Sequence, residues 1–219
     1  MRKLLVTVTG VSPLMMDQMG EDVLTSLATG VRIEQKKDTP DRDVAAKKIY
    51  RDSKERIGLP STMLLAALVE AGRQVSYQGK TNISTADSTK LHAFMRIEED
   101  HLIFPVGEGQ TETEWCVDKR RGRLDSGVAV CLRRPKFPKW GFTCTVIFDD
   151  KMIGQDKIEK LFETAGRFQG LGSFRPNCRG PFGIFATTKV EDVTPEEWKR
   201  VADKTNSATD EEDSLDKDG

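Results

Sequence analysis

Hydrophobic and polar residues alternate along two segments of the chain, as in strands that bury one face. Residues 3–9 read KLLVTVT and place Leu4, Val6 and Val8 on one side. Residues 140–148 read WGFTCTVIF and place every second side chain, from Trp140 to Phe148, on one side. This pattern predicts a central strand whose aromatic stripe is core rather than a platform for bases. A closing strand is expected over residues 182–193.

Two further segments carry apolar residues every three or four positions, as amphipathic helices do. The first opens with Pro60 and Ser61, and Ser61 is the expected N-cap. Its buried face consists of Leu64, Leu68, Ala71 and Val75. The buried face of the second consists of Ile158, Leu161, Phe162, Ala165 and Phe168. The resulting order of strand, helix, strands, helix and strand predicts an α+β, ferredoxin-like (RRM-like) antiparallel sheet with two core helices on one face.

We expect one domain over residues 1–195, with insertions at about 20–58 and 77–138 where periodicity is weak. Residues 196–219 form an acidic tail that we expect to be disordered. No segment approaches the roughly 18 apolar residues of a membrane span. The expected location is therefore cytoplasmic, with no membrane partner.

The charge is divided unevenly along the chain. From residue 191 onward eleven acidic residues stand against four basic ones, a net charge of −7, so residues 1–190 carry +6 of the total of −1. This division indicates a body that binds a polyanion. The four cysteines lack C-x-x-C spacing and the two histidines lack metal-binding spacing, so no metal or cofactor is expected.

Residues 170–185 read GLGSFRPNCRGPFGIF, a glycine-dense loop that carries two arginines. Glycines permit positive φ and close approach of another chain, and guanidinium groups suit phosphates. The alternative is a tight turn whose glycines serve geometry alone.

Three segments together resemble the RAMP superfamily of CRISPR-associated proteins, which act in antiviral defence. They are VTVTGVSPLMMDQM at 6–19, IGLPSTMLLAALVEAGR at 57–73 and AGRFQGLGSFRPNCRGPFGIF at 165–185. The similarity is greatest to the backbone subunit that coats guide RNA in multisubunit effector complexes. It implies a modified RNA-recognition fold, often with a mobile thumb, that polymerises along single-stranded nucleic acid mainly through phosphate contacts. Pro176, Asn177 and Pro181 stiffen the loop and depart from the family's usual pattern.

The resemblance places the family's glycine-rich motif on loop residues, to which basic and methionine residues add candidates for nucleic-acid binding. These candidates are Met15, Met16, Lys119, Arg120, Arg121, Arg123, Arg133, Arg134, Arg167, Gly170, Gly172, Ser173, Arg175, Arg179 and Gly180. Core packing is the alternative for the methionines. Further basic residues are Lys47, Lys48, Arg51, Lys54, Arg56, Lys136 and Lys139. The expected partners are single-stranded RNA or DNA, copies of the chain in a head-to-tail filament, and other effector subunits.

Two alternatives remain open beside this binding function. One is a single-stranded DNA-binding protein of a phage or mobile element, because such proteins in bacteria also carry acidic tails. The other is a metal-dependent ribonuclease, because Asp17 lies about where some backbone subunits of the superfamily carry a catalytic aspartate. We expect a non-catalytic protein, since acid–base chemistry needs partnered residues that the sequence does not display.

Overall fold

The centre of the fold is a four-stranded antiparallel sheet. The computed structural model describes residues 1–31, 39–123, 127, 129–196 and 198. Within them the strand order is β11–β1–β10–β6. These strands are β1 (Arg2–Gly10), β6 (Met95–Ile97), β10 (Gly141–Phe148) and β11 (Phe185–Asp192). The segment at 140–148 is therefore a central strand, as its alternation predicts.

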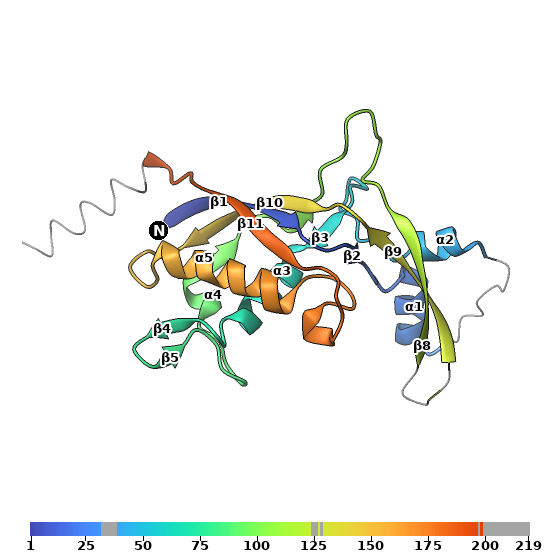
Figure 1. Ribbon diagram of the computed structural model, residues 1–219, viewed down its shortest axis with the longest axis horizontal. Helices are drawn as coiled ribbons and strands as arrows, with labels where there is room; N and C mark the ends of the chain where they lie inside the picture. The colour runs from blue at the N-terminus through green and yellow to red at the C-terminus, as the bar shows by residue number, and fades with distance from the viewer. Residues whose placement is uncertain (32–38, 124–126, 128, 197, 199–219) are drawn as a thin grey trace, which may run out of the picture.

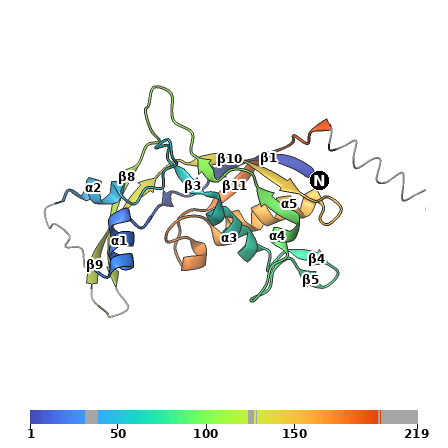
Figure 2. The ribbon, with the colours of Figure 1, turned by 180° about the vertical axis from the view of Figure 1, so that it is seen from behind.

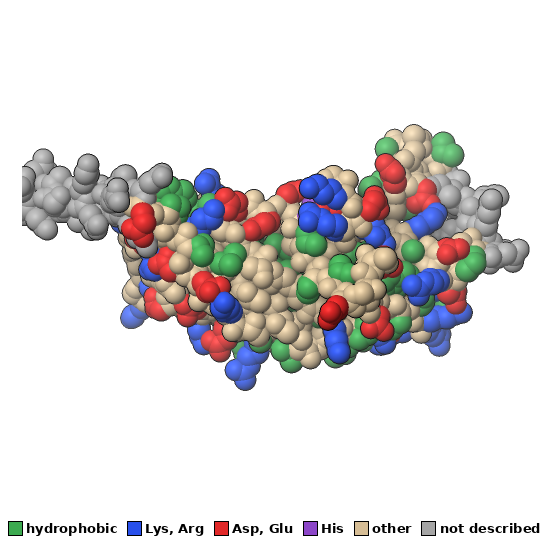
Figure 3. All heavy atoms as spheres, turned by 90° about the horizontal axis from the view of Figure 1, so that it is seen from above, with side chains coloured by type: hydrophobic (Ala, Val, Ile, Leu, Met, Phe, Trp, Pro, Cys, Tyr) green, Lys and Arg blue, Asp and Glu red, His purple; other side chains and the backbone are tan. Residues whose placement is uncertain are grey.

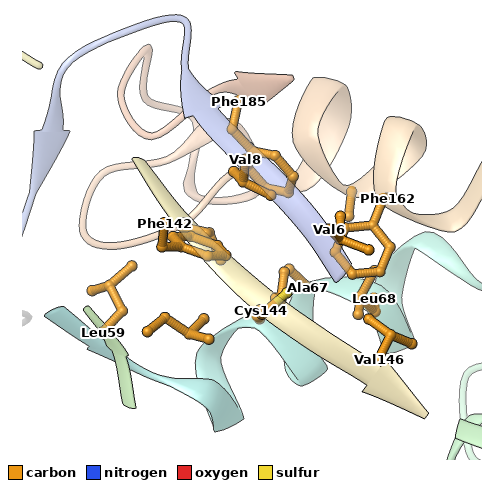
Figure 4. Packing of buried hydrophobic residues seen from close by; sticks show 14 of the residues in the cluster. Val6, Val8, Leu59, Ala67, Leu68, Phe142, Cys144, Val146, Phe162 and Phe185 are labelled. Carbon is orange, nitrogen blue, oxygen red and sulfur yellow. The ribbon is translucent and has the colours of Figure 1, made fainter. Parts of the chain in front are cut away.

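Two helices, α3 (Ser61–Ala71) and α5 (Gln155–Thr164), cover one face of this sheet (Figure 1). The register pairs Val6 with Cys144 and Val8 with Phe142, so that alternate side chains of β1 and β10 point toward the helices. Figure 4 shows these side chains packed with Leu68 of α3 and Phe162 of α5. This arrangement confirms the α+β class.

The start of α3 differs from the expected cap. Pro60 occupies the N-cap position, and no side chain caps this end. The preceding strand β3 (Gly58–Pro60) pairs with β7 (His101–Ile103). This pairing brings the Asp100 carbonyl to 2.8 Å from the backbone N–H of Ser61, which donates to it. A backbone acceptor therefore replaces the side-chain cap.

The second core helix changes its winding near its end. After α5 the chain continues as a π-helix, η1 (Ala165–Gln169). Its wider turn displaces the following residues from the 3.6-residue repeat. Phe168 is consequently 50% exposed, and the prediction that it belongs to the buried face is wrong.

Parts of both expected insertions meet in one arm beside the sheet (Figures 1 and 2). The arm consists of α1 (Glu21–Thr29), α2 (Asp41–Ala46), β8 (Cys116–Arg123) and β9 (Ala129–Phe137). Strands β8 and β9 form a hairpin, and β2 (Leu14–Met15) pairs with β9 to complete a second sheet. Helix α2 packs against the β8–β9 hairpin. The range 77–138 also contains β6, which belongs to the central sheet.

The remaining elements support the edge of the central sheet. They are α4 (Leu91–Phe94) and the hairpin of β4 (Ser76–Gln78) and β5 (Thr81–Asn82). Of the expected tail, only residues 196 and 198 are described, so the prediction of disorder lies outside the described residues. Within the described residues, no helix combines the length and apolar character needed to cross a membrane.

The π-helix yields a test with two phenylalanines of one helical segment. Phe162 is 1% exposed, so Phe162→Ala should lower the free energy of unfolding by about 3–5 kcal/mol through loss of burial and a cavity. Phe168→Ala should change it by no more than about 0.5 kcal/mol. Urea unfolding measures both, and equal losses would contradict this helical register.

Candidate nucleic-acid interface

The glycine-rich loop is fixed against the segment that follows β1. Its two ends meet where the Leu171 N–H donates to the Gly183 carbonyl at 2.9 Å. The Gly183 N–H donates to the Pro13 carbonyl at 2.9 Å, and the Ser173 N–H donates to the Met15 carbonyl at 2.7 Å. The loop is thus held beside β2 and, through the pairing of β2 with β9, beside the arm.

Two glycines make this docking possible. Gly172 and Gly183 have φ values of +73° and +71°, which side-chain-bearing residues rarely adopt. A Cβ at Gly172 would collide with the Met15 carbonyl, and one at Gly183 would collide with the Leu171 carbonyl. At these two positions the absence of a side chain lets the loop approach the chain's own backbone rather than another chain.

The arginines of this region differ in their surroundings. Arg175 donates from Nη1 to the Gly172 carbonyl at 2.9 Å and braces the loop. Arg179 follows a short 3-10 helix, η2 (Pro176–Cys178), as its exposed C-cap. Among the described residues no carboxylate lies within ion-pair distance of Arg179. Arg167 is exposed and stacks over Phe168 at 5.4 Å.

The hairpin of the arm contacts the loop through Arg120. Its guanidinium group lies 4.7 Å from the ring centroid of Phe182, which is buried. The same guanidinium donates to both carboxylate oxygens of Asp118, at 2.5 and 3.0 Å. Lys136 reaches Asp118 from the neighbouring strand at 3.9 Å. Asp118 is therefore shared by two cations.

Asp17 is shared by two cations in the same way. Its carboxylate accepts from Lys48 at 2.9 Å and from Arg134 at 2.6 Å. Burial of the Asp17 carboxyl raises its pKa, but the hydrogen bonds and charges of Lys48 and Arg134 outweigh this effect and hold the pKa below its ordinary value. The ion pair joins the segment after β2 to the arm.

A third shared carboxylate lies on the opposite face of the hairpin. Asp41 of α2 accepts from Lys119 at 2.7 Å and from Arg133 at 3.1 Å. Lys119 and Arg133 face each other across β8 and β9, next to the pair of Asp118 and Arg134. Because successive side chains of a strand point to opposite faces, Lys119 and Arg133 lie on the face of the hairpin opposite Asp118 and Arg134. The structure therefore separates them from the glycine-rich loop. Arg121 is exposed and shares their face by alternation, whereas the side chain of Arg123 lies outside the described residues.

The two methionines proposed as contacts for bases are core residues. Met15 and Met16 are both 0% exposed, which contradicts a contact between their side chains and a bound strand. The reason is non-local, because pairing of β2 with Phe137 and Lys136 of β9 draws this segment inward. Met19, two residues beyond Asp17, is 49% exposed.

One aromatic pair was not predicted from the sequence. Phe174 and Phe182 lie in the loop with ring centroids 6.0 Å apart, and Phe174 is 37% exposed. The sequence did contain a signal for this pair, namely an aromatic residue between glycines and arginines. The positive φ of Phe174, +54°, could not be read from the sequence.

The sheet face opposite the helices is polar and mostly uncharged at its centre (Figure 3). Thr7 and Thr143 lie side by side across β1 and β10, with their hydroxyl oxygens 3.3 Å apart. The rings of Trp140 and Phe142 are 5% and 3% exposed and belong to the core, as expected. A groove of about 920 Å³ lies at one end of this face, with Lys139 among its lining residues.

Comparisons with known proteins find similar chains among solved structures. No protein-family model and no curated protein matches the chain. Chains of solved structures do match, including one in the cryo-EM structure of the Type III-B Cmr-beta bound to cognate target RNA. The two chains are 10% identical, with a TM-score of 0.41, over 88% of this chain and 61% of the neighbour. This chain thus spans less than two thirds of the neighbour's length.

Metal-dependent cleavage at Asp17 would need further ligands. No group of three or more His, Cys, Asp or Glu side chains within the described part of the chain could hold a metal ion. The Asp17 carboxylate is instead engaged by two cations. The arrangement present at Asp17 is an ion-pair anchor between two parts of the fold.

The lowered pKa of Asp17 predicts a pH dependence of stability. Because its folded pKa lies below the unfolded value of about 3.9, the ion pairs stabilise the protein above that value and this contribution is lost as pH falls through the folded pKa. Asp17→Asn should cost about 1–2 kcal/mol at pH 7, with the difference from the unsubstituted protein closing toward pH 2.

Chemical denaturation between pH 7 and pH 2 measures this difference. Asp87→Asn is the matched control, because Asp87 is exposed and has no ion pair among the described residues. A cost of Asp17→Asn that stays constant down to pH 2 would show that the loss of stability does not come from the ion pairs of Asp17.

Proposed function

We propose that this protein is a sequence-independent, single-stranded RNA-binding subunit that assembles along the strand with copies of itself and other subunits. Its core is a ferredoxin-like unit of the RAMP type, supported by the chain order β1, α3, β6, β10, α5, β11 and by the sheet order. The resemblance of three sequence segments to RAMP backbone subunits supports the same class.

The observation that carries the proposal is a cationic junction. We use this name for the place where the glycine-rich loop, the segment from β2 to Asp17 and the hairpin β8–β9 meet. Six cations gather there: Lys48, Arg120, Arg134, Lys136, Arg175 and Arg179. Two carboxylates, Asp17 and Asp118, offset them only in part.

The junction suits a nucleic-acid backbone for a physical reason. Each shared carboxylate neutralises one of its two cations and holds both in place, so an excess of positive charge is positioned before a ligand arrives. Phosphates that replace counterions at such a site gain affinity without regard to sequence. Arginine forks can bind phosphate oxygens in pairs, which fixes the register of the backbone.

Assembly along the strand is supported by the exposed helix α1 of the arm. None of its residues is buried, and Val23, Leu24 and Leu27 are 41%, 52% and 69% exposed. Exposed apolar groups on one helix are typical of a surface that contacts another protein. A head-to-tail contact of this surface with a different surface of the next copy would propagate along a strand.

The proposal does not include a catalytic step. Asp17 is the candidate catalytic residue, and its carboxylate serves as the partner of Lys48 and Arg134. We propose instead that Asp17 keeps these two cations oriented toward a bound backbone.

Removal of two junction cations tests the binding function. Arg120→Ala with Arg179→Ala should weaken binding of a uridine oligomer and reduce the slope of log K against log salt by roughly 0.7 for each phosphate that the variant no longer binds. Fluorescence anisotropy across a salt series measures both quantities. Thermal unfolding of the variant checks that the fold is retained.

Lys80→Ala is the control, because Lys80 is an exposed cation in the turn between β4 and β5. This hairpin lies away from the arm (Figure 1). A slope change no larger than that of the control would refute binding at the junction. Tighter binding to deoxythymidine oligomers than to uridine oligomers would favour the DNA-binding alternative.

A further inference from the structure

Phe174 has an unusual combination of backbone conformation and exposure. Its φ of +54° lies in the left-handed region, where a bulky residue costs conformational energy. Its side chain is nevertheless 37% exposed, so burial of the ring does not account for the conformation. Phe182, the ring beside it, is 7% exposed.

The loop holds Phe174 in one orientation. Its carbonyl oxygen accepts from the Phe182 N–H at 3.3 Å. Gly180 lies against it so closely that an added Cβ would fall 2.6 Å from the ring's Cγ and would collide with the carbonyl oxygen. The Phe182 ring supports it from the side, at a centroid distance of 6.0 Å and an interplanar angle of 34°. The exposed ring is therefore preorganised.

One cation contacts this aromatic pair, and two others belong to the same loop. The Arg120 guanidinium group lies 4.7 Å from the Phe182 ring centroid, and Arg175 and Arg179 belong to the same loop. A ligand that matches this surface carries a flat ring for Phe174 and negative charge for the arginines. A nucleotide within a single strand has both, because its base has a π-face and its backbone carries phosphates.

We propose that Phe174 is a base-stacking residue, on which one base of each bound segment of the strand lies while the junction cations hold the phosphates. This inference rests on the proposed function and specifies its contact with the bases. The absence of a side chain at Gly180 is then required, because it leaves room for the Phe174 ring. Stacking tolerates every base, in agreement with sequence-independent binding.

Two oligomers distinguish binding through base stacking from binding through phosphate charge. The first is a uridine oligomer, and the second is an oligomer of equal length in which every residue lacks its base. Phe174→Leu should weaken binding of the uridine oligomer roughly 5- to 100-fold and leave the slope against salt unchanged. It should not alter binding of the base-free oligomer, and Phe174→Trp should restore affinity for the uridine oligomer.

Two further variants keep the test decisive. Phe174→Gly relieves the positive φ, so it should fold at least as stably as the unsubstituted protein and still lose affinity for the uridine oligomer. Phe168→Leu removes the other exposed phenylalanine of the described residues and should leave affinity unchanged.

Phe174→Gly or Phe174→Leu with unchanged affinity would overturn the inference, as would equal losses with both oligomers. In either case the unsubstituted protein still binds, and the proposed function stands. Failure of the unsubstituted protein to bind either oligomer at low salt would instead overturn the proposed function together with the inference.

Discussion

The structure depends on the contact between the glycine-rich loop and the backbone that follows β1. The carbonyls of Pro13 and Met15 accept hydrogen bonds from Gly183 and Ser173, and this contact exists only because Gly172 lacks a side chain. The same backbone segment forms β2, which pairs with the arm. The loop, the central sheet and the arm are therefore positioned by one short stretch of chain, and the cations of the loop and of the arm reach one junction.

Electrostatic balance at the junction follows from this arrangement. Many basic residues of the arm form ion pairs with carboxylates. The number of arginines and lysines therefore overstates the positive charge that is left to bind a ligand. Asp17 and Asp118 each serve two cations, which leaves positive charge in excess while fixing its geometry. Such pairing reduces the side-chain entropy lost when a polyanion binds. Arg179, which has no such partner among the described residues, is the cation most available to a ligand.

Local periodicity predicted the elements that form the core. The alternation in β1 and β10 and the helical repeats of α3 and α5 are properties of neighbouring residues, so the sequence revealed them. Non-local pairing determined the rest: β2 pairs with β9 and buries Met15 and Met16, and residues from both expected insertions form one arm. The glycine-rich loop and several cations of the junction were found from composition. The sharing of Asp17, the separation of Lys119 and Arg133 from the loop, and the left-handed Phe174 depend on the folded backbone.

We propose that copies of this chain coat a single strand through the cationic junction. Light scattering with uridine oligomers of increasing length tests this claim most directly. The account predicts that the mass of the complex rises by one 24.5 kDa copy for each constant increment of nucleotides, and that the steps disappear at high salt. A complex that holds the same number of copies at every length, or no complex at low salt, would contradict it.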